Sequence, residues 1–570
     1  MKKIAYGISN FKTIIEDGYY YVDKTKYIEM LENLNERYLI FLRPRRFGKS
    51  LFISLLEYYY DINYKENKLF DEFYIGNNPT KLKNSYYILK FNFSGINTKI
   101  EKETLEGFRT KVINGIKEFL IKNKFKMKID EEKTATEIMS TFLTEVRALI
   151  DGKIYILIDE YDHFANELLG FNYNFYQNSV SSNGFVRKFY EVIKDGTGTG
   201  IVDRLFITGV SPITLDSMTS GFNIGSDITL DSDFNEMMGF TEEEVKKLAN
   251  ATIENYDIDA NIDRLRDYYN GYKFNKKCKN RVYNSDMVLY YMSYYQKNKE
   301  EPENIIDNNI LSDYRKIGKL FEIGGRNNER IKILKEIVMG IEQEVVISSR
   351  FNLEIEFNLD DFKSLLFYMG LMTIKRVDEF GAVYIGVPNY VIRELYFEYF
   401  NKIIEEEADF KIDDSKIREA ILEIARDGKI DKLIKLTENI LHKLSNRDFI
   451  KFDEKYVKVI MLMYLYKSNL YFTKSEYEVE DGYIDIVLKK GTIGQPRYYG
   501  MFELKYISKK DYTEDLLKKK LEEAKEQLMK YKESEELRSM NNMKKWALVF
   551  VGSECKGMEC ISDNMKKDIM

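Results

Sequence analysis

Cysteine, histidine and proline are scarce in this sequence. Its 570 residues include 3 Cys, 2 His and 6 Pro. Three cysteines without a pairing pattern exclude a disulfide scaffold and fit a reducing compartment, so we expect a cytoplasmic protein. Two histidines, His163 and His442, are too few for a histidine-rich metal cluster. Oxygen ligands would therefore have to hold any metal ion, and such ligands suit Mg²⁺ or Mn²⁺.

The sequence also lacks a long apolar run and a strong net charge. The longest apolar stretches, such as residues 365–374, fall short of the roughly 18 to 20 residues that span a bilayer. Residues 1–12 begin basic but lead into no apolar run, so we expect neither a secretory signal nor a membrane partner. With 87 Lys+Arg and 93 Asp+Glu, the net charge of −6 gives no global attraction for nucleic acid, which would need a local basic site.

Changes of pattern divide the chain into four segments. Residues 1–231 alternate short apolar runs with amphipathic helical segments, which is typical of an α/β domain with a parallel sheet. Residues 232–300 and 301–450 are mostly helical in pattern, and we expect a helical lid followed by a helical connecting region. Residues 451–562 predict a second α/β domain, because a helix, a hairpin, a strand, a long helix at 512–531 and a last strand follow in turn.

A phosphate-binding loop is predicted where Arg43-Pro-Arg-Arg-Phe-Gly-Lys-Ser50 follows the apolar strand 38–42 and opens a helix. In that context the backbone at Gly48 faces the phosphates of a nucleotide, Lys49 reaches the β and γ oxygens, and Ser50 ligates Mg²⁺. Arg43 stands where the usual motif has its first glycine, so the match is degenerate. A chance occurrence of Gly-Lys-Ser is the alternative.

Polar residues at two strand ends support the nucleotide site. Residues 154–158 form an apolar strand that ends in Asp159 and Glu160, and the carboxyl ends of parallel strands line the ligand-binding edge of a sheet. We expect Asp159 to hold Mg²⁺ and Glu160 to polarise the attacking water. Thr208 ends a further strand, where an ATPase places a polar sensor of the γ-phosphate. The alternatives are a solvated strand end for the carboxylates and a structural role for Thr208.

Eight short motifs lie in the first half of the chain, at residues 7–11, 21–25, 43–50, 158–162, 206–210, 239–245, 269–272 and 282–284. Together they resemble one family, the AAA-ATPase-like proteins common in anaerobic bacteria. The glycine-poor loop is the usual form in that family, whose members typically carry a C-terminal PD-(D/E)XK nuclease-like domain. The resemblance implies ATP and Mg²⁺ as cofactors and places Arg45 and Arg46 near the phosphates, with salt bridging as their alternative role. Rings are common among related ATPases, so the resemblance is compatible with a homo-oligomer.

A second acidic site is predicted in residues 451–562. Asp485 lies on one expected strand and Glu503-Leu-Lys505 on the next, while Glu454 lies on the helix before them. Residues two apart share one face of a strand, so Glu503 and Lys505 point the same way. If the strands pair, Asp485 and Glu503 converge on one Mg²⁺ or Mn²⁺ ion, with Glu454 as a further ligand and Lys505 orienting water. A chance grouping is the alternative in so charged a chain.

This arrangement resembles the D…ExK site of PD-(D/E)XK nucleases. Gln527 and Tyr531 match the QxxxY motif often seen after that core, whereas Tyr483 departs from the arginine that relatives often carry at the hairpin turn. We therefore predict an ATPase coupled to a metal-dependent nuclease that acts on nucleic acid, DNA rather than RNA. The alternative is a nucleotide-gated switch or scaffold whose C-terminal domain binds nucleic acid or a protein partner without cutting.

Overall fold

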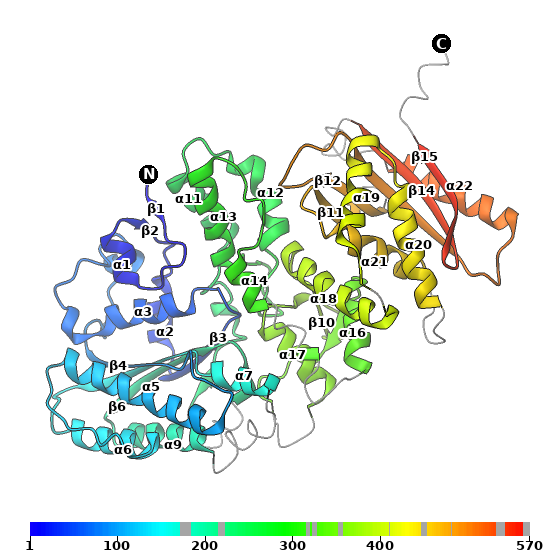
Figure 1. Cartoon of the computed structure of the whole chain (residues 1–570). Coiled ribbons are helices and arrows are strands. Elements are labelled where there is room, and N and C mark those ends of the chain that lie inside the picture. Colours follow the sequence, from blue (N-terminus) through cyan, green and yellow to red (C-terminus); the bar gives the residue numbers. More distant parts are fainter. Residues whose placement is uncertain are drawn as a thin grey trace. The chain divides into compact units, whose positions relative to one another are not determined.

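The computed structural model consists of two units, each with its own β-sheets (Figure 1). It describes residues 1–171, 184–214, 223–314, 320–321, 328–351, 357–409, 411–445, 453–479, 482–531 and 542–561. The first unit comprises Met1–Glu300, Ile306–Ile333 and Glu342–Ile392, and the second comprises Glu301–Ile305, Leu334–Ile341 and Arg393–Met570. The expected lid, residues 232–300, lies within the first unit, and the expected connecting region, residues 301–450, is divided between the two. None of the helices in the described ranges is both long and apolar enough to span a bilayer.

A five-stranded parallel sheet forms the centre of the first unit. Its strands lie in the order β4 (Tyr86–Asn92), β5 (Lys153–Asp159), β6 (Val202–Gly209), β3 (Tyr38–Leu42) and β7 (Ser226–Asp227). β3, β5 and β6 are buried along most of their length, as expected of strands that helices cover on both faces. Parallel neighbours need crossover connections, which explains why strands and helices alternate in the sequence. The sheet confirms the predicted α/β fold class.

Helices cover this sheet, and their starting points are encoded locally. Thr134 and Glu137 form a reciprocal capping box at the start of α6, and Thr241 and Glu244 form another at the start of α11. Figure 1 shows α3 on one side of the sheet and α6 and α9 on the other. The elements up to α9 are β1 (Lys3–Ile4), α1 (Phe11–Glu16), β2 (Tyr19–Tyr20), α2 (Lys26–Asn33), α3 (Lys49–Tyr60), α4 (Tyr74–Asn77), α5 (Glu101–Lys122), α6 (Ala135–Val146), α7 (His163–Phe171) and α9 (Phe185–Gly198).

The rest of the first unit is a helical region followed by a small sheet. α11 (Glu242–Thr252), α12 (Ile258–Tyr269) and α13 (Ser285–Asn298) pack against one another. The small sheet is antiparallel, in the order β8 (Gln343–Val345), β10 (Val383–Gly386) and β9 (Thr373–Val377). α14 (Asn308–Tyr314) and the part of α16 (Asn328–Val338) up to Ile333 come before this sheet, and α17 (Leu359–Tyr368) comes between β8 and β9.

The second unit is built on a mixed five-stranded sheet. Its order is β11 (Tyr471–Val479), β12 (Gly482–Lys490), β13 (Tyr499–Ile507), β14 (Met543–Val551) and β15 (Glu554–Ile561), and only the β13–β14 pair is parallel. α22 (Glu514–Lys530) connects that parallel pair and buries Ala524 and Leu528 against the sheet. This confirms a second α/β domain; Asp481, expected in the hairpin turn, lies outside the described residues. The other helices are α18 (Tyr390–Ala408), α19 (Asp414–Asp427), α20 (Asp431–Ser445) and α21 (Glu454–Leu465).

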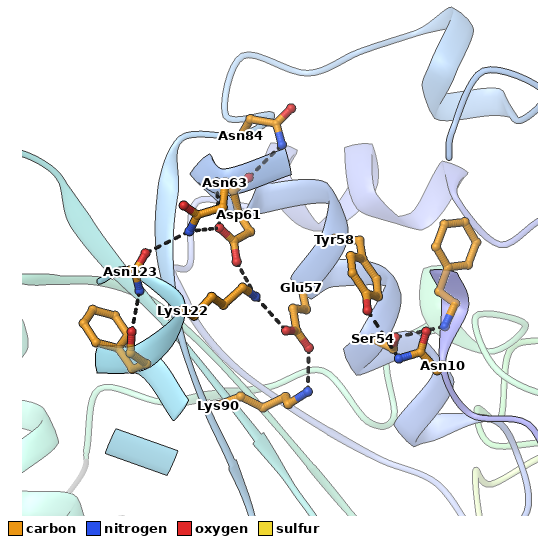
Figure 2. Close-up of polar contacts among 12 residues, drawn as sticks. Asn10, Ser54, Glu57, Tyr58, Asp61, Asn63, Asn84, Lys90, Lys122 and Asn123 are labelled. Carbon is orange, nitrogen blue, oxygen red and sulfur yellow. Dashed lines mark hydrogen bonds and ion pairs between the residues drawn. The ribbon is translucent and has the colours of Figure 1, made fainter. Parts of the chain in front are cut away.

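An ion-pair network fixes the C-terminal end of α3, the helix that the phosphate loop opens (Figure 2). Lys122 Nζ on α5 lies 2.9 Å from Glu57 Oε1 and 2.5 Å from Oδ2 of the fully buried Asp61. Lys90 Nζ on β4 lies 2.5 Å from Glu57 Oε2. Burial alone would raise the pKa of Glu57, but the two ammonium groups outweigh it and lower that pKa. The network therefore ties α3 to the sheet and to α5.

Replacing Lys122 by methionine is expected to lower the free energy of unfolding of the first unit by about 3 kcal/mol, because it leaves Asp61 buried without its cation. Lys117→Met is the matched control on the same helix. It breaks only the exposed pair with Glu131 and should cost less than about 1 kcal/mol. Urea unfolding of both variants measures the difference, and equal losses would contradict a structural role for the network.

Candidate functional site

The loop between β3 and α3 lines a cavity of about 470 Å³ in the first unit. A volume in this range suits a small organic ligand or cofactor. The cavity walls come from the N-terminal segment at residues 7–9 and 20–22, from residues 237–240 and from the start of α13. All five loop residues that the sequence assigned to the nucleotide line this cavity, namely Arg45, Arg46, Gly48, Lys49 and Ser50.

Arg43, which replaces the usual first glycine, anchors the loop from inside the protein. Its side chain is fully buried, and its guanidinium donates to the carbonyl oxygens of Leu42, Thr229 and Phe234, each at 2.8 Å. Burial lowers the pKa of Arg43 to about 9. The left-handed backbone of the loop falls instead at Arg46, with φ 69°, and at Gly48, with φ 94°. The degenerate motif is thus compatible with a phosphate loop, because no glycine is required where Arg43 stands.

Lys49 and Arg46 both have partners within the first unit. Lys49 Nζ donates to the carbonyl oxygens of Arg43 at 3.1 Å and Pro44 at 3.0 Å, and only 4% of the residue is exposed. Within the described residues these bonds use two of the three ammonium donors. Arg46 Nη1 lies 3.3 Å from Asp286 Oδ2 on α13. Arg46 therefore makes the salt bridge that the sequence left as an alternative, whereas Lys49 keeps one donor for an anionic ligand.

The strand-end carboxylates lie beside the loop as predicted. Asp159 is 3% exposed, and the Ser50 side chain lies close enough to influence the pKa of its carboxyl group, so the two expected Mg²⁺ ligands are neighbours. Burial, with the nearby charge of Glu160, raises the pKa of Asp159 to about 6. Burial also disfavours the Glu160 charge, but the His163 ring, whose Nδ1 lies 3.5 Å from Glu160 Oε2, and the charge of Lys49 outweigh it and lower the pKa of Glu160 to about 2. Glu160 is thus held as an anion facing the cavity.

Thr208 is not placed as the sequence suggested. Its side chain is fully buried, and its hydroxyl donates to the carbonyl oxygen of Phe41 at 2.7 Å. Phe41 lies opposite Thr208 where β3 pairs with β6. Thr208 is not among the residues that line the cavity. The γ-phosphate sensor assignment is therefore corrected to a bond between two strands, because the threonine points at its neighbouring strand.

Asp162 is a structural residue of this site that sequence reasoning passed over. It is fully buried and accepts hydrogen bonds from the backbone N–H groups of Val210, at 3.1 Å, and Ser211, at 2.7 Å. These bonds join the end of β5 to the end of β6. The only signal in the sequence was its position three residues after Asp159, which does not distinguish a buried anchor from a surface acid.

Gly209→Ala is expected to disrupt this junction. A Cβ at Gly209 would overlap the carboxylate of Asp162 and the ring of Tyr161. We expect a loss of about 1 to 3 kcal/mol in the stability of the first unit and weaker ATP binding, since overpacking forces its neighbours to move. Gly198→Ala on α9 is the control, because a Cβ there meets no atom within 4 Å. Thermal unfolding and ATP titration of the two variants provide the measurement; equal behaviour would contradict the tight junction.

The second unit brings together the residues predicted for a second acidic site. β12 and β13 pair through Ile486 with Phe502 and Val487 with Met501, and continuing this register places Asp485 opposite Glu503. Asp485 is 7% exposed and Glu503 is 3% exposed. Asp485 Oδ2 accepts a hydrogen bond from Leu504 N at 2.8 Å, and Lys505 Nζ donates to Glu503 Oε1 at 2.8 Å.

Glu503 has the properties expected of a metal ligand. Burial, with the nearby charge of Asp485, raises the pKa of Glu503 to about 7. Its second oxygen, Oε2, is buried and has no hydrogen-bond partner. A Mg²⁺ ion is commonly held by one or two carboxylates together with substrate phosphates, so Asp485 and Glu503 fit such an ion.

Glu454 does not complete the predicted set of three metal ligands. Among the described residues, no three His, Cys, Asp or Glu side chains form a group that could hold a metal ion. Lys505 and Asp485 lie close enough to Glu454 to influence the pKa of its carboxyl group. Ammonium groups bind the other two carboxylates, those of Asp485 and Glu503. One of them belongs to Lys458, which sequence reasoning missed because only the fold brings α21 against β12.

Of the two QxxxY residues, Tyr531 lies close enough to Glu503 and Asp485 to interact with their charges. Tyr531 donates its hydroxyl to the carbonyl oxygen of Tyr483 at 2.8 Å. Burial, with the charges of Glu503 and Asp485, raises the pKa of Tyr531 to about 12. Gln527 Oε1 is buried without a hydrogen-bond partner. Tyr531 thus holds the start of β12, and the Gln527 amide is left for another ligand.

These features are typical of two classes of domain: a P-loop α/β domain and a nuclease-like domain with an acidic pair and a lysine. Family comparisons name both. Residues 5–219 match the AAA-ATPase-like family, described as a predicted AAA-ATPase, and residues 452–560 match the PD-(D/E)XK nuclease superfamily. The chain therefore combines an AAA-ATPase-like domain with a C-terminal PD-(D/E)XK nuclease superfamily domain, as the motifs predicted.

Two known proteins are similar to parts of this chain. One is an uncharacterized protein in the vnfD 5'region of Azotobacter chroococcum mcd 1, 28% identical over 301 residues, or 50% of this chain and 51% of the relative. The chain thus spans about half the length of that curated relative. The other is a structure of the Aeropyrum pernix ORC1 protein in complex with DNA, with a TM-score of 0.26 and 10% identity. That likeness covers 67% of this chain and 93% of the other.

Proposed function

We propose that the first unit binds and hydrolyses MgATP and that the second is a metal-dependent nuclease. The observation that carries the ATPase half is the buried Lys49, which lines a nucleotide-sized cavity together with Ser50 and Glu160 and lies close enough to Asp159 to act on its carboxylate. The observation that carries the nuclease half is the unpartnered Oε2 of Glu503 opposite Asp485. The substrate would be nucleic acid phosphodiesters, DNA in preference to RNA, in the cytoplasm.

In the ATPase half, each residue has a separate task. Ser50 and Asp159 would hold Mg²⁺, which supplies positive charge to the triphosphate. Lys49 binds the phosphates with its remaining donor, and Arg45 adds a positive charge to the cavity wall. Glu160, kept ionised by His163 and Lys49, orients the attacking water.

In the nuclease half, Asp485 and Glu503 would hold one Mg²⁺ or Mn²⁺ ion. When bound, that ion neutralises charge on the scissile phosphate and makes a water molecule more acidic. Lys505 sits 2.8 Å from Glu503 Oε1 and orients water at the same face of β13. Gln527, with its unpartnered amide oxygen, contacts substrate or water.

A second candidate function follows from one specific observation. Ammonium groups already bind both carboxylates, since Lys458 Nζ lies 3.1 Å from Asp485 Oδ1 and Lys505 lies beside Glu503. A nucleotide-gated scaffold that binds nucleic acid without cutting would need no metal there. Incubation with labelled single-stranded DNA, double-stranded DNA and RNA, with Mg²⁺ or Mn²⁺ and with or without ATP, separates the two. Metal-dependent cleavage supports the nuclease, and binding without cleavage supports the scaffold.

A further inference from the structure

Lys458 is a buried lysine held between two carboxylates of the second unit. It lies on α21, one turn after Glu454, and is 5% exposed. Its ammonium is 3.1 Å from Asp485 Oδ1 and also binds Glu476 Oε1. The other oxygen of Asp485 accepts the hydrogen bond from Leu504 N, so each oxygen has one protein partner and keeps a second lone pair for a metal ion. A lysine is rarely buried unless it is paired in this way.

Glu476 reaches this lysine from β11. Ser475 pairs with Ile486 and Tyr477 with Ile484, so Glu476 stands opposite Asp485 on the neighbouring strand. Its backbone has φ 51°, in the left-handed region that non-glycine residues rarely adopt. Two carboxylates on adjacent strands therefore share one cation, and that cation is an amino-acid side chain.

The charges of the site leave room for one divalent ion. With all four carboxylates ionised, the form that a bound cation favours, four carboxylates and two ammonium groups give a net charge of −2, which a single divalent ion neutralises. Lys520, which also acts on Glu454, is paired with Glu523 and does not change this balance. Without Lys458 the net charge would be −3, and the facing carboxylates of Glu476 and Asp485 could bind a second ion. The groups counted are Glu454, Glu476, Asp485, Glu503, Lys458 and Lys505.

We propose that Lys458 takes the place of a second metal ion, so that this site binds a single divalent cation at Asp485 and Glu503. The inference rests on the proposed nuclease function, because it assumes that the buried Oε2 of Glu503 receives a metal. Two-metal sites clamp phosphates between ions about 4 Å apart. Here a fixed ammonium occupies the second position and Glu476 holds it there.

Counting bound Mn²⁺ tests this inference. The full-length protein without nucleotide is titrated with Mn²⁺ by calorimetry, and the ions bound by an Asp485→Ala/Glu503→Ala variant are subtracted as background. We expect one ion in the wild-type site, two in Lys458→Met and one again in Lys458→Met/Glu476→Gln. Lys455→Met, at an exposed position on the same helix, should keep one ion.

The outcomes separate this inference from the proposed nuclease function. A wild-type count of zero or two overturns the inference, as does an unchanged count in a folded Lys458→Met variant. If that variant does not fold, as judged by thermal unfolding, the wild-type count still decides. One bound ion without cleavage of any substrate would overturn the nuclease alone, whereas two bound ions in an active enzyme would overturn this inference alone.

Discussion

Lys49→Ala is expected to weaken ATP binding by about 10-fold to 150-fold, which corresponds to the roughly 1.5 to 3 kcal/mol of a hydrogen bond to a charged group. The ammonium is already oriented, since two of its donors are held by the carbonyl oxygens of Arg43 and Pro44. Binding of ATP therefore requires little rearrangement of this side chain. Alanine removes both the charge and the preorganisation. Calorimetric titration with ATP and Mg²⁺ measures the affinity.

Two further variants make the result specific. Glu160→Gln removes the charge that orients water but leaves Lys49 and Ser50 in place, so we expect ATP binding to persist while phosphate release slows by about 100-fold. Lys188→Ala on α9 removes an exposed lysine that pairs only with Glu191 among the described residues. This control should change neither the affinity for ATP nor the rate of phosphate release. Unchanged nucleotide affinity in Lys49→Ala would defeat the ATPase half of the proposal.

The parts of the fold that could be read from sequence are those with a strong local signal. The strand predicted at residues 38–42 is β3, and the one at residues 154–158 lies within β5, because fully buried parallel strands appear as unbroken apolar runs. The helix predicted at residues 512–531 is α22, which Thr513 caps. The acidic pair could also be predicted, since Asp485 and Glu503 lie on consecutive strands that form an antiparallel pair.

The missed features depend on contacts between distant segments. Lys458 and Glu476 belong to the second site only because α21 packs beside β11 and β12, and no spacing along the chain encodes that contact. Thr208 was misassigned because a strand end alone does not reveal which way its side chain points. Arg43 looked like a defect in a motif, whereas its carbonyl partners come from as far along the chain as Phe234.

Asp485→Ala is expected to reduce metal-dependent cleavage by about 1,000-fold or more. A metal ion supplies several kcal/mol of transition-state stabilisation, and each 1.36 kcal/mol corresponds to about tenfold in rate. Asp485 also accepts the Leu504 N–H and pairs with Lys458, so its removal alters the position of Glu503 on the next strand. Gel analysis of labelled DNA and RNA in Mg²⁺ or Mn²⁺ measures the loss.

Asp485→Asn separates charge from shape in this prediction. The amide oxygen can still accept the Leu504 hydrogen bond, but the group no longer carries the charge that binds a cation, so cleavage should fall nearly as far as in Asp485→Ala. Asp515→Ala, at an exposed position in the first turn of α22, is the control and should cut at the wild-type rate. Cleavage that survives in both Asp485 variants would place the reaction elsewhere in the chain, since neither could then hold the ion that neutralises the phosphate.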